Sequence, residues 1–128
     1  MAVAAFLAPV GCSLGADSEP QPVNGAPKEI VATVNQLEHA VAQRDWARVC
    51  DQLFTEAALK RAGGAECAKR LAVDGADVRR PSIQIQGIEV NGDKAAVKVA
   101  TTAQGQARLV DTLQLRRQGG RWLVEALG

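Results

Sequence analysis

The sequence predicts an α+β domain in which N-terminal helices pack on a curved four-stranded antiparallel meander. In the last third of the chain, apolar and polar residues alternate with period two in four runs, at residues 82–90, 95–102, 107–116 and 121–127, as expected for strands with one buried face. Between these runs lie Asn-Gly-Asp at 91–93, Gln-Gly at 104–105 and Gln-Gly-Gly at 118–120, which favour hairpin turns. Upstream, apolar residues recur three and four positions apart, which is typical of helices with one face toward a core.

Length and composition limit what kind of protein this is. The 128 residues allow one domain, and a net charge of +1 gives no electrostatic case for binding nucleic acid. Tyrosine is absent, and the aromatic residues after position 11 are Trp46, Phe54 and Trp122. The core must therefore be built from Val, Leu, Ile and Ala, and a small domain with such a core often needs a covalent staple.

The first 27 residues predict export and attachment to a membrane. Residues 2–10 are uncharged and too short to cross a bilayer, but they suit the apolar region of a secretory signal peptide. Val10-Gly11-Cys12 then resembles a bacterial lipobox, which implies cleavage before Cys12 and a diacylglycerol-modified thiol. We therefore expect a signal peptide with its lipobox at 1–12, a Pro/Gly-rich linker at 13–27 and an extracytoplasmic domain anchored to the cell membrane by lipid. The alternative is a buried N-terminal strand or helix, with Cys12 as an ordinary small hydrophobic residue.

Residues 28–44 are expected to form an amphipathic helix. Pro27 suits the first turn of a helix, and four apolar residues then form one stripe: Ile30, Val34, Leu37 and Val41. His39, the only histidine, lies about 180° from that stripe at 100° per residue. We therefore expect His39 to be a solvated surface residue rather than a general base or a metal ligand.

Three shorter helices are expected next. Asp45 is a candidate N-cap for a helix over 46–54, with Trp46, Val49, Cys50 and Leu53 on one side. Thr55 is expected to cap a further turn over 56–61, which glycines at 63–64 end. The third helix is expected over 65–73, before a turn at 74–77.

Cys50 and Cys67 are 17 residues apart, and three interpretations compete. A zinc site needs two more ligands, and His39 faces the wrong way. A redox pair is usually a Cys-x-x-Cys motif. A structural disulfide needs only export to an oxidising compartment, so we favour it over free thiols. No metal and no cofactor are expected.

The strands predict a bent sheet with one unusual carboxylate. Ile83 and Ile85 share one parity and Ile88 the other, so we expect a β-bulge at Gly87 that bends the sheet. Asp111 shares a face with apolar neighbours, which indicates a pocket acid, a structural ion pair with a nearby arginine, or a shifted strand phase that exposes it. In the last run, Trp122, Val124 and Ala126 are expected on one side, and Leu123 and Leu127 on the other.

Three segments carry a resemblance to a known fold. They are Arg-Asp-Trp-Ala-Arg-Val-Cys at 44–50 followed by Cys67, Val-Asn-Gly-Asp-Lys-Ala-Ala-Val at 90–97, and Gly-Gly-Arg-Trp-Leu-Val at 119–124. With helices before a meander, residues 28–127 resemble the nuclear transport factor two-like (cystatin-like) superfamily, and within it small exported actinobacterial-type lipoproteins. The resemblance implies a cone-shaped cavity between helices and sheet, which we expect Trp46, Leu109, Leu113 and Asp111 to line.

These observations favour a non-catalytic, lipid-anchored domain that binds a small apolar ligand or a protein partner. The alternative is an isomerase- or cyclase-like enzyme that uses Asp111 in the pocket. Such an enzyme would also need a second polar group to stabilise the charge that develops during the reaction. The sequence has no tyrosine for this role, and His39 is expected to point outward. A further expectation is self-association as a homodimer through the outer face of the sheet.

Overall fold

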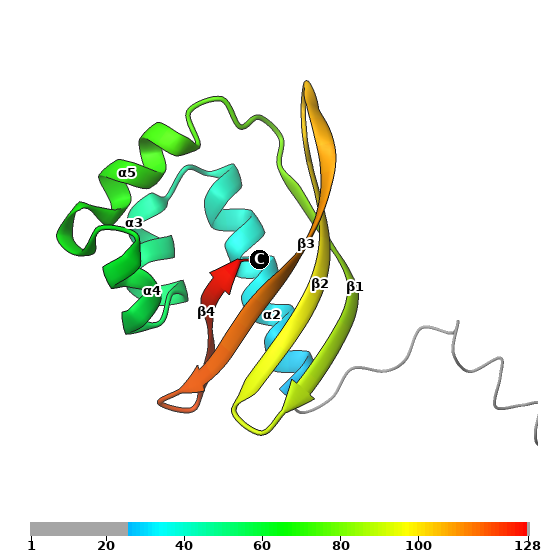
Figure 1. Ribbon diagram of the computed structural model, residues 1–128. Coiled ribbons are helices and arrows are strands. Elements are labelled where there is room, and N and C mark those ends of the chain that lie inside the picture. Colours follow the sequence, from blue (N-terminus) through cyan, green and yellow to red (C-terminus); the bar gives the residue numbers. More distant parts are fainter. Residues whose placement is uncertain (1–25, 128) are drawn as a thin grey trace, which may run out of the picture.

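The computed structural model describes residues 26–127, which form a layer of helices against one sheet (Figure 1). The sheet is an antiparallel meander in the order β1-β2-β3-β4. Its strands are β1 (Ser82–Asn91), β2 (Lys94–Ala103), β3 (Gln106–Gln118) and β4 (Arg121–Leu127). The predicted α+β fold class is confirmed, and each strand contains its predicted run.

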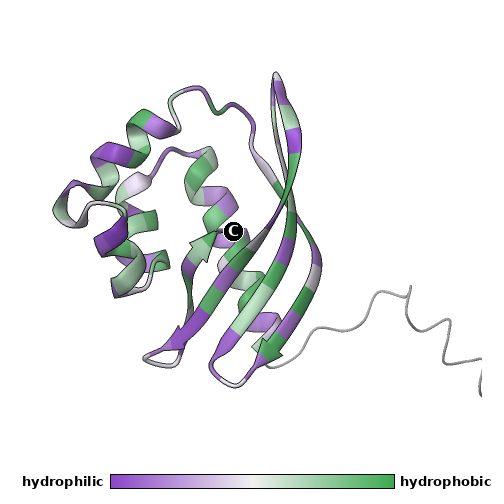
Figure 2. Cartoon of the chain, viewed as in Figure 1, coloured by the Kyte–Doolittle hydropathy of each residue, from purple (hydrophilic) through white to green (hydrophobic). Residues whose placement is uncertain are grey.

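The alternation of residue types separates the two faces of the sheet (Figure 2). Val97 and Val99 on β2 are buried on the inner face, whereas Lys98 between them is exposed. The predicted bulge is confirmed, because the pairing of β1 with β2 shifts between Ile85 and Gly87. The sheet therefore presents a curved apolar face to the helices.

A second irregularity in the sheet was not expected. Leu115 pairs with Val124 but Gln114 pairs with Ala126, so Glu125 is an extra residue in β4. The predicted faces of Ala126 and Leu127 are therefore wrong. Beyond the bulge, Ala126 follows the parity of the outer face, and Leu127 lies opposite the inward-facing Leu113.

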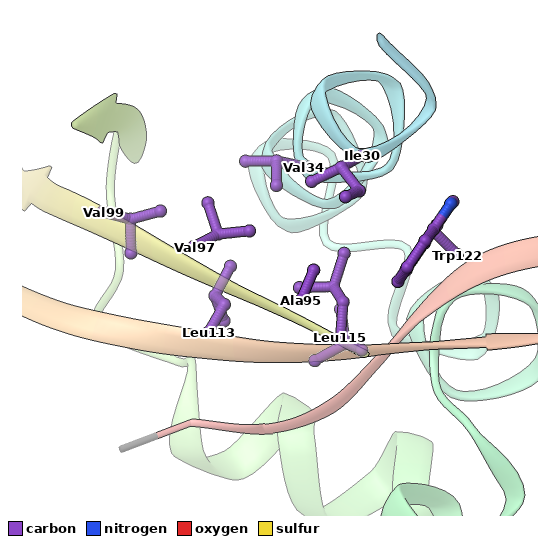
Figure 3. Close-up of a cluster of buried hydrophobic side chains, with 9 residues drawn as sticks. Ile30, Val34, Ala95, Val97, Val99, Leu113, Leu115 and Trp122 are labelled. Carbon is purple, nitrogen blue, oxygen red and sulfur yellow. The ribbon is translucent and has the colours of Figure 1, made fainter. Parts of the chain in front are cut away.

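Helix α2 (Ala26–Ala42) lies across the concave face of the sheet (Figure 1). It begins two residues before the predicted start, because Pro27 fits within the first turn. Figure 3 shows Ile30 and Val34 pointing from this helix toward Val97 and Leu115 of the sheet, and both α2 residues are fully buried. His39 is exposed, as predicted.

A buried hydrogen bond also joins α2 to the sheet. The hydroxyl of Thr33 donates to the backbone oxygen of Trp122 in β4, at 2.8 Å. Thr33 is 8% exposed and Trp122 is 3% exposed, so solvent cannot replace this bond easily. The hydrogen bond therefore fixes α2 against β4, in addition to the apolar packing of α2 against the centre of the sheet.

The segment from 46 to 74 forms a second group of helices, which we call the helical arm. It contains α3 (Trp46–Arg48), the π-helix η2 (Val49–Leu53), α4 (Glu56–Arg61), the 3-10 helix η3 (Gly64–Glu66) and α5 (Cys67–Asp74). The expected caps are present: a carboxylate oxygen of Asp45 accepts from the N–H of Arg48 at 3.2 Å, and the hydroxyl of Thr55 accepts from the N–H of Ala58 at 3.1 Å.

Two of the predicted helices in the arm are wrong in detail. The segment 46–54 is one turn of α-helix followed by a π-helix, and Phe54 leaves it in an extended conformation to bridge Val124 of β4. The segment 65–73 begins as η3 and becomes α-helical at Cys67. In the first of these places, the bridge with distant Val124 draws Phe54 out of the helical segment.

Three attachments hold the arm in place. Cys50 in η2 and Cys67 in α5 form the favoured disulfide, with Cα atoms 6.1 Å apart. The N–H of Thr55 donates to the backbone oxygen of Val124 at 3.0 Å. Arg44, at a positive φ of 57°, donates from its guanidinium to three backbone oxygens between α5 and β1, those of Gly75, Ala76 and Val78, at 2.9–3.2 Å. These bonds join the arm to α2, to the sheet and to itself.

The predicted signal segment at 1–12 with Cys12, and residues 13–25 of the predicted linker at 13–27, lie outside the described residues. The last two residues of that predicted linker, Ala26 and Pro27, belong to α2 instead, because Pro27 fits the first turn of a helix. Among residues 26–127, no helix combines the length and the apolar character that a membrane span requires. In the same range, no group of three or more His, Cys, Asp or Glu side chains is placed to hold a metal ion.

The disulfide yields a first prediction. Replacing Cys50 and Cys67 together by Ala should lower the free energy of unfolding by about 3 kcal/mol, because the unfolded chain regains the freedom of a loop of this size. Urea denaturation checks this value. A reducing agent should destabilise the wild-type protein by a similar amount and leave the double variant unchanged. Equal unfolding midpoints for the two proteins under oxidising conditions would contradict the structural role of the bond.

Candidate functional site

A groove of about 450 Å³ lies between α2, the helical arm, the middle of β3 and the end of β4. Its volume is within the range of small-molecule sites. Apolar side chains from all three parts line it, among them Leu37, Val41, Trp46, Leu71, Leu113 and Leu127. The arrangement of α2 explains the groove, because the first half of its apolar stripe is buried in the core while Leu37 and Val41 are only half-buried.

Two charged residues also line the groove, Arg61 at the end of α4 and Glu125 at the bulge in β4. A guanidinium nitrogen of Arg61 lies 3.9 Å from one carboxylate oxygen of Glu125 and also donates to the backbone oxygen of the same residue. Arg116 approaches the other carboxylate oxygen at 3.6 Å. One carboxylate therefore stands between two guanidinium groups at the rim of the groove.

The structure brings together only some of the residues expected to line a pocket. Trp46 and Leu113 line the groove. Leu109 is 58% exposed and lines a separate hollow of about 190 Å³, which shares Val41 with the groove. Asp111 is half-buried opposite Val99 and lines neither of these two hollows.

The place where β4 ends explains this division. The last pair between β3 and β4 is Leu113 with Leu127, so the strand that walls the groove stops there. Asp111 and Leu109 lie beyond that pair, on a part of β3 that β4 does not cover. Residue parity had placed all these side chains on one face, but it carries no information about where a neighbouring strand ends.

Sequence reasoning did not single out Arg61 and Glu125. Both positions lie within predicted elements, and an Arg in the last turn of a helix is common because it complements the helix dipole. Their contact spans 64 residues and depends on the unexpected bulge in β4. A charged residue inside the otherwise apolar run 122–127 was the one available signal.

Helices covering the concave face of a bulged antiparallel meander, with an apolar groove between them, define the class of the protein by its fold. Residues 26–127 have the nuclear transport factor 2-like (NTF2-like) fold. An NTF2-like protein of unknown function from Silicibacter pomeroyi DSS-3 matches with a TM-score of 0.59 and 18% sequence identity, covering 78% of this chain and 90% of that one.

Two further solved structures agree on the fold. An NTF2-like protein of unknown function from Shewanella baltica OS155 matches with a TM-score of 0.57 and 15% identity over 79% of this chain and 92% of that one. A putative NTF2-like transpeptidase from Campylobacter jejuni matches with a TM-score of 0.54 and 16% identity over 80% and 99%. No protein-family model matches the chain, and no curated protein does. At these identities the likeness establishes the fold and leaves the function to be argued from the groove.

Close packing at one wall of the groove yields a second prediction. A Cβ atom added at Gly75 would lie 2.7 Å from the indole of Trp46, so Gly75→Ala must displace that ring, which lines the groove. We expect a loss of roughly 1–3 kcal/mol in the free energy of unfolding and an altered tryptophan fluorescence spectrum.

Gly87→Ala is the matched control for this substitution. A Cβ atom at Gly87 would meet no other atom within 4 Å, so its cost should stay within about 0.5 kcal/mol. Denaturation curves of the two variants give the two free energies of unfolding to be compared. Equal stabilities would mean that the contact of Gly75 with Trp46 does not constrain the wall.

Proposed function

We propose that the protein is a non-catalytic binding domain, anchored by lipid outside the cytoplasm, that takes a small apolar ligand into the groove. The groove itself carries this proposal. Its walls come from three separate parts of the fold, and all but two of the residues that line it are apolar. An apolar, largely preformed concavity with a few polar groups at its rim is the usual form of a small-molecule site.

The cysteines support the location outside the cytoplasm. A structural disulfide such as Cys50–Cys67 persists in oxidising compartments and is rare in the cytosol. Cys12 follows an apolar, uncharged segment that suits a signal peptide. Residues 13–25 are rich in Pro and Gly, and at about 3 Å per residue they would hold the domain some 40 Å from a membrane.

The polar groups of the groove support a binding role over a catalytic one. Its one carboxylate, Glu125, is engaged by Arg61 and Arg116. The other acid considered, Asp111, lies outside the groove. A binding domain needs no proton-transfer group, and the groove lining fits that requirement.

Filling the groove gives a third prediction. Ala62 is half-buried in the groove lining, so Ala62→Phe should occupy the space and weaken binding of the neutral apolar dye N-phenyl-1-naphthylamine at least about tenfold, or 1.4 kcal/mol. Ala57→Phe is the control, because Ala57 is exposed on α4, the helix that Ala62 caps, and does not line the groove. Dye fluorescence titrations measure both affinities. Unchanged binding by Ala62→Phe would exclude the groove as the site.

The lipid anchor gives a fourth prediction. Intact-mass spectrometry of the protein from its native membrane should show a chain that begins at Cys12, carries acyl groups and lacks free thiols at Cys50 and Cys67. Cys12→Ser should move the protein from the membrane fraction to the soluble fraction, because the thiol that accepts the lipid is gone. A full-length, unacylated product in the native host would contradict the anchor and leave groove binding to be judged by the dye titration.

A further inference from the structure

We propose that the ligand is a single-chain amphiphile with an anionic head group, held with its apolar chain in the groove and its head against Arg61. The inference rests on the proposed function in so far as the groove binds a ligand at all. It adds the chemical class of that ligand and the residue that selects it.

The dimensions and lining of the groove favour one apolar chain. At about 450 Å³ the groove lies in the lower half of the range of about 300–1,000 Å³ for small-molecule sites, so a two-chain lipid would exceed it. Leu37, Trp46 and Leu113 face the space from α2, the arm and the sheet. These side chains offer an apolar ligand dispersion and hydrophobic contacts without hydrogen-bond requirements in the walls.

The charges at the rim favour an anionic head. The cluster of Arg61, Glu125 and Arg116 contains two guanidinium groups and one carboxylate, so it retains an excess positive charge. Glu125 directs one oxygen toward each arginine. A cationic head would meet two guanidinium groups that already lie 3.9 Å and 3.6 Å from that carboxylate, although neither is hydrogen-bonded to it. An anionic head would instead complete the charge balance of the cluster.

Arg61 is the residue placed to receive that head. Its side chain is 56% exposed and lines the groove, whereas Arg116 contacts Glu125 without lining the groove. A guanidinium group has five N–H donors, and the contacts of Arg61 with Glu125 leave donors for a ligand. A carboxylate or a phosphate accepts such donors in pairs, so the shared chemistry is an anionic oxygen group on one apolar chain.

The test compares ligands that share a chain and differ in the head group. The soluble Cys12→Ser protein, with the disulfide intact, is titrated in a calorimeter with dodecanoate, monododecyl phosphate, dodecanol and dodecyltrimethylammonium, each below its micelle concentration. We expect both anions to bind about five- to tenfold more tightly than dodecanol, in keeping with one partly exposed charge-assisted contact, and the cation to bind most weakly. The ratio of carboxylate to phosphate affinity distinguishes a fatty acid from a phosphate-headed lipid.

Three variants locate the selection. Arg61→Gln should remove the preference for anions over dodecanol, and Arg61→Lys should restore part of it. Lys60→Gln is the matched control, because it removes the same charge from the neighbouring exposed residue that does not line the groove. Glu125→Gln should have the opposite sign and strengthen binding of both anions.

The outcomes separate this inference from the proposed function. Equal binding of all four amphiphiles, or a preference that survives Arg61→Gln, would overturn the head-group inference while groove binding stands. Equal losses from Lys60→Gln and Arg61→Gln would also overturn it, because the effect would then be one of net charge. If no amphiphile and no neutral dye binds, the proposed function fails as well.

Discussion

The packing of α2 on the sheet is the contact on which the rest of the structure depends. Its apolar stripe is longer than the part of the sheet that it covers closely. Ile30 and Val34 are fully buried against β2, β3 and Trp122, whereas Leu37 and Val41, on the same stripe, are only half-buried. One regular helix thus supplies both the centre of the core and one wall of the groove, and its first half holds the second half in position.

The opposite wall of the groove is held by a few directional bonds as well as by apolar packing. The helical arm packs on α2 through a small buried cluster in which Val49 and Leu53 join Ala40 of α2. The disulfide, the hydrogen bond of Thr55 to Val124 and the donation from Arg44 to three backbone oxygens fix the rest of the arm around that cluster. An arm held by a few directional bonds can leave a space that a collapsed apolar core would have filled, because those bonds constrain its position independently of close packing.

Local rules were enough to predict much of this architecture from the sequence. The bulge at Gly87, the caps Asp45 and Thr55 and the outward His39 follow from residue spacing and backbone preference within one element. The features that could not be predicted depend on distant contacts. The π-helix before Phe54 adjoins a bridge to Val124, 70 residues away, and the isolation of Asp111 from the groove depends on where β4 ends. Parity assigns a face to a residue, but coverage of that face is a property of the assembled sheet.

The bulge in β4 joins the apolar and the charged parts of the site. In a regular strand with Val124 on the inner face, Glu125 and Leu127 would both point to the outer face, because successive side chains alternate. The extra residue at the bulge changes the positions of both side chains. It leaves Glu125 unpaired in the ladder, between Arg61 and Arg116, and it places Leu127 opposite Leu113 at the end of the groove. A single irregularity in one edge strand therefore sets a polar rim beside an apolar wall, which is the arrangement that an amphiphile requires.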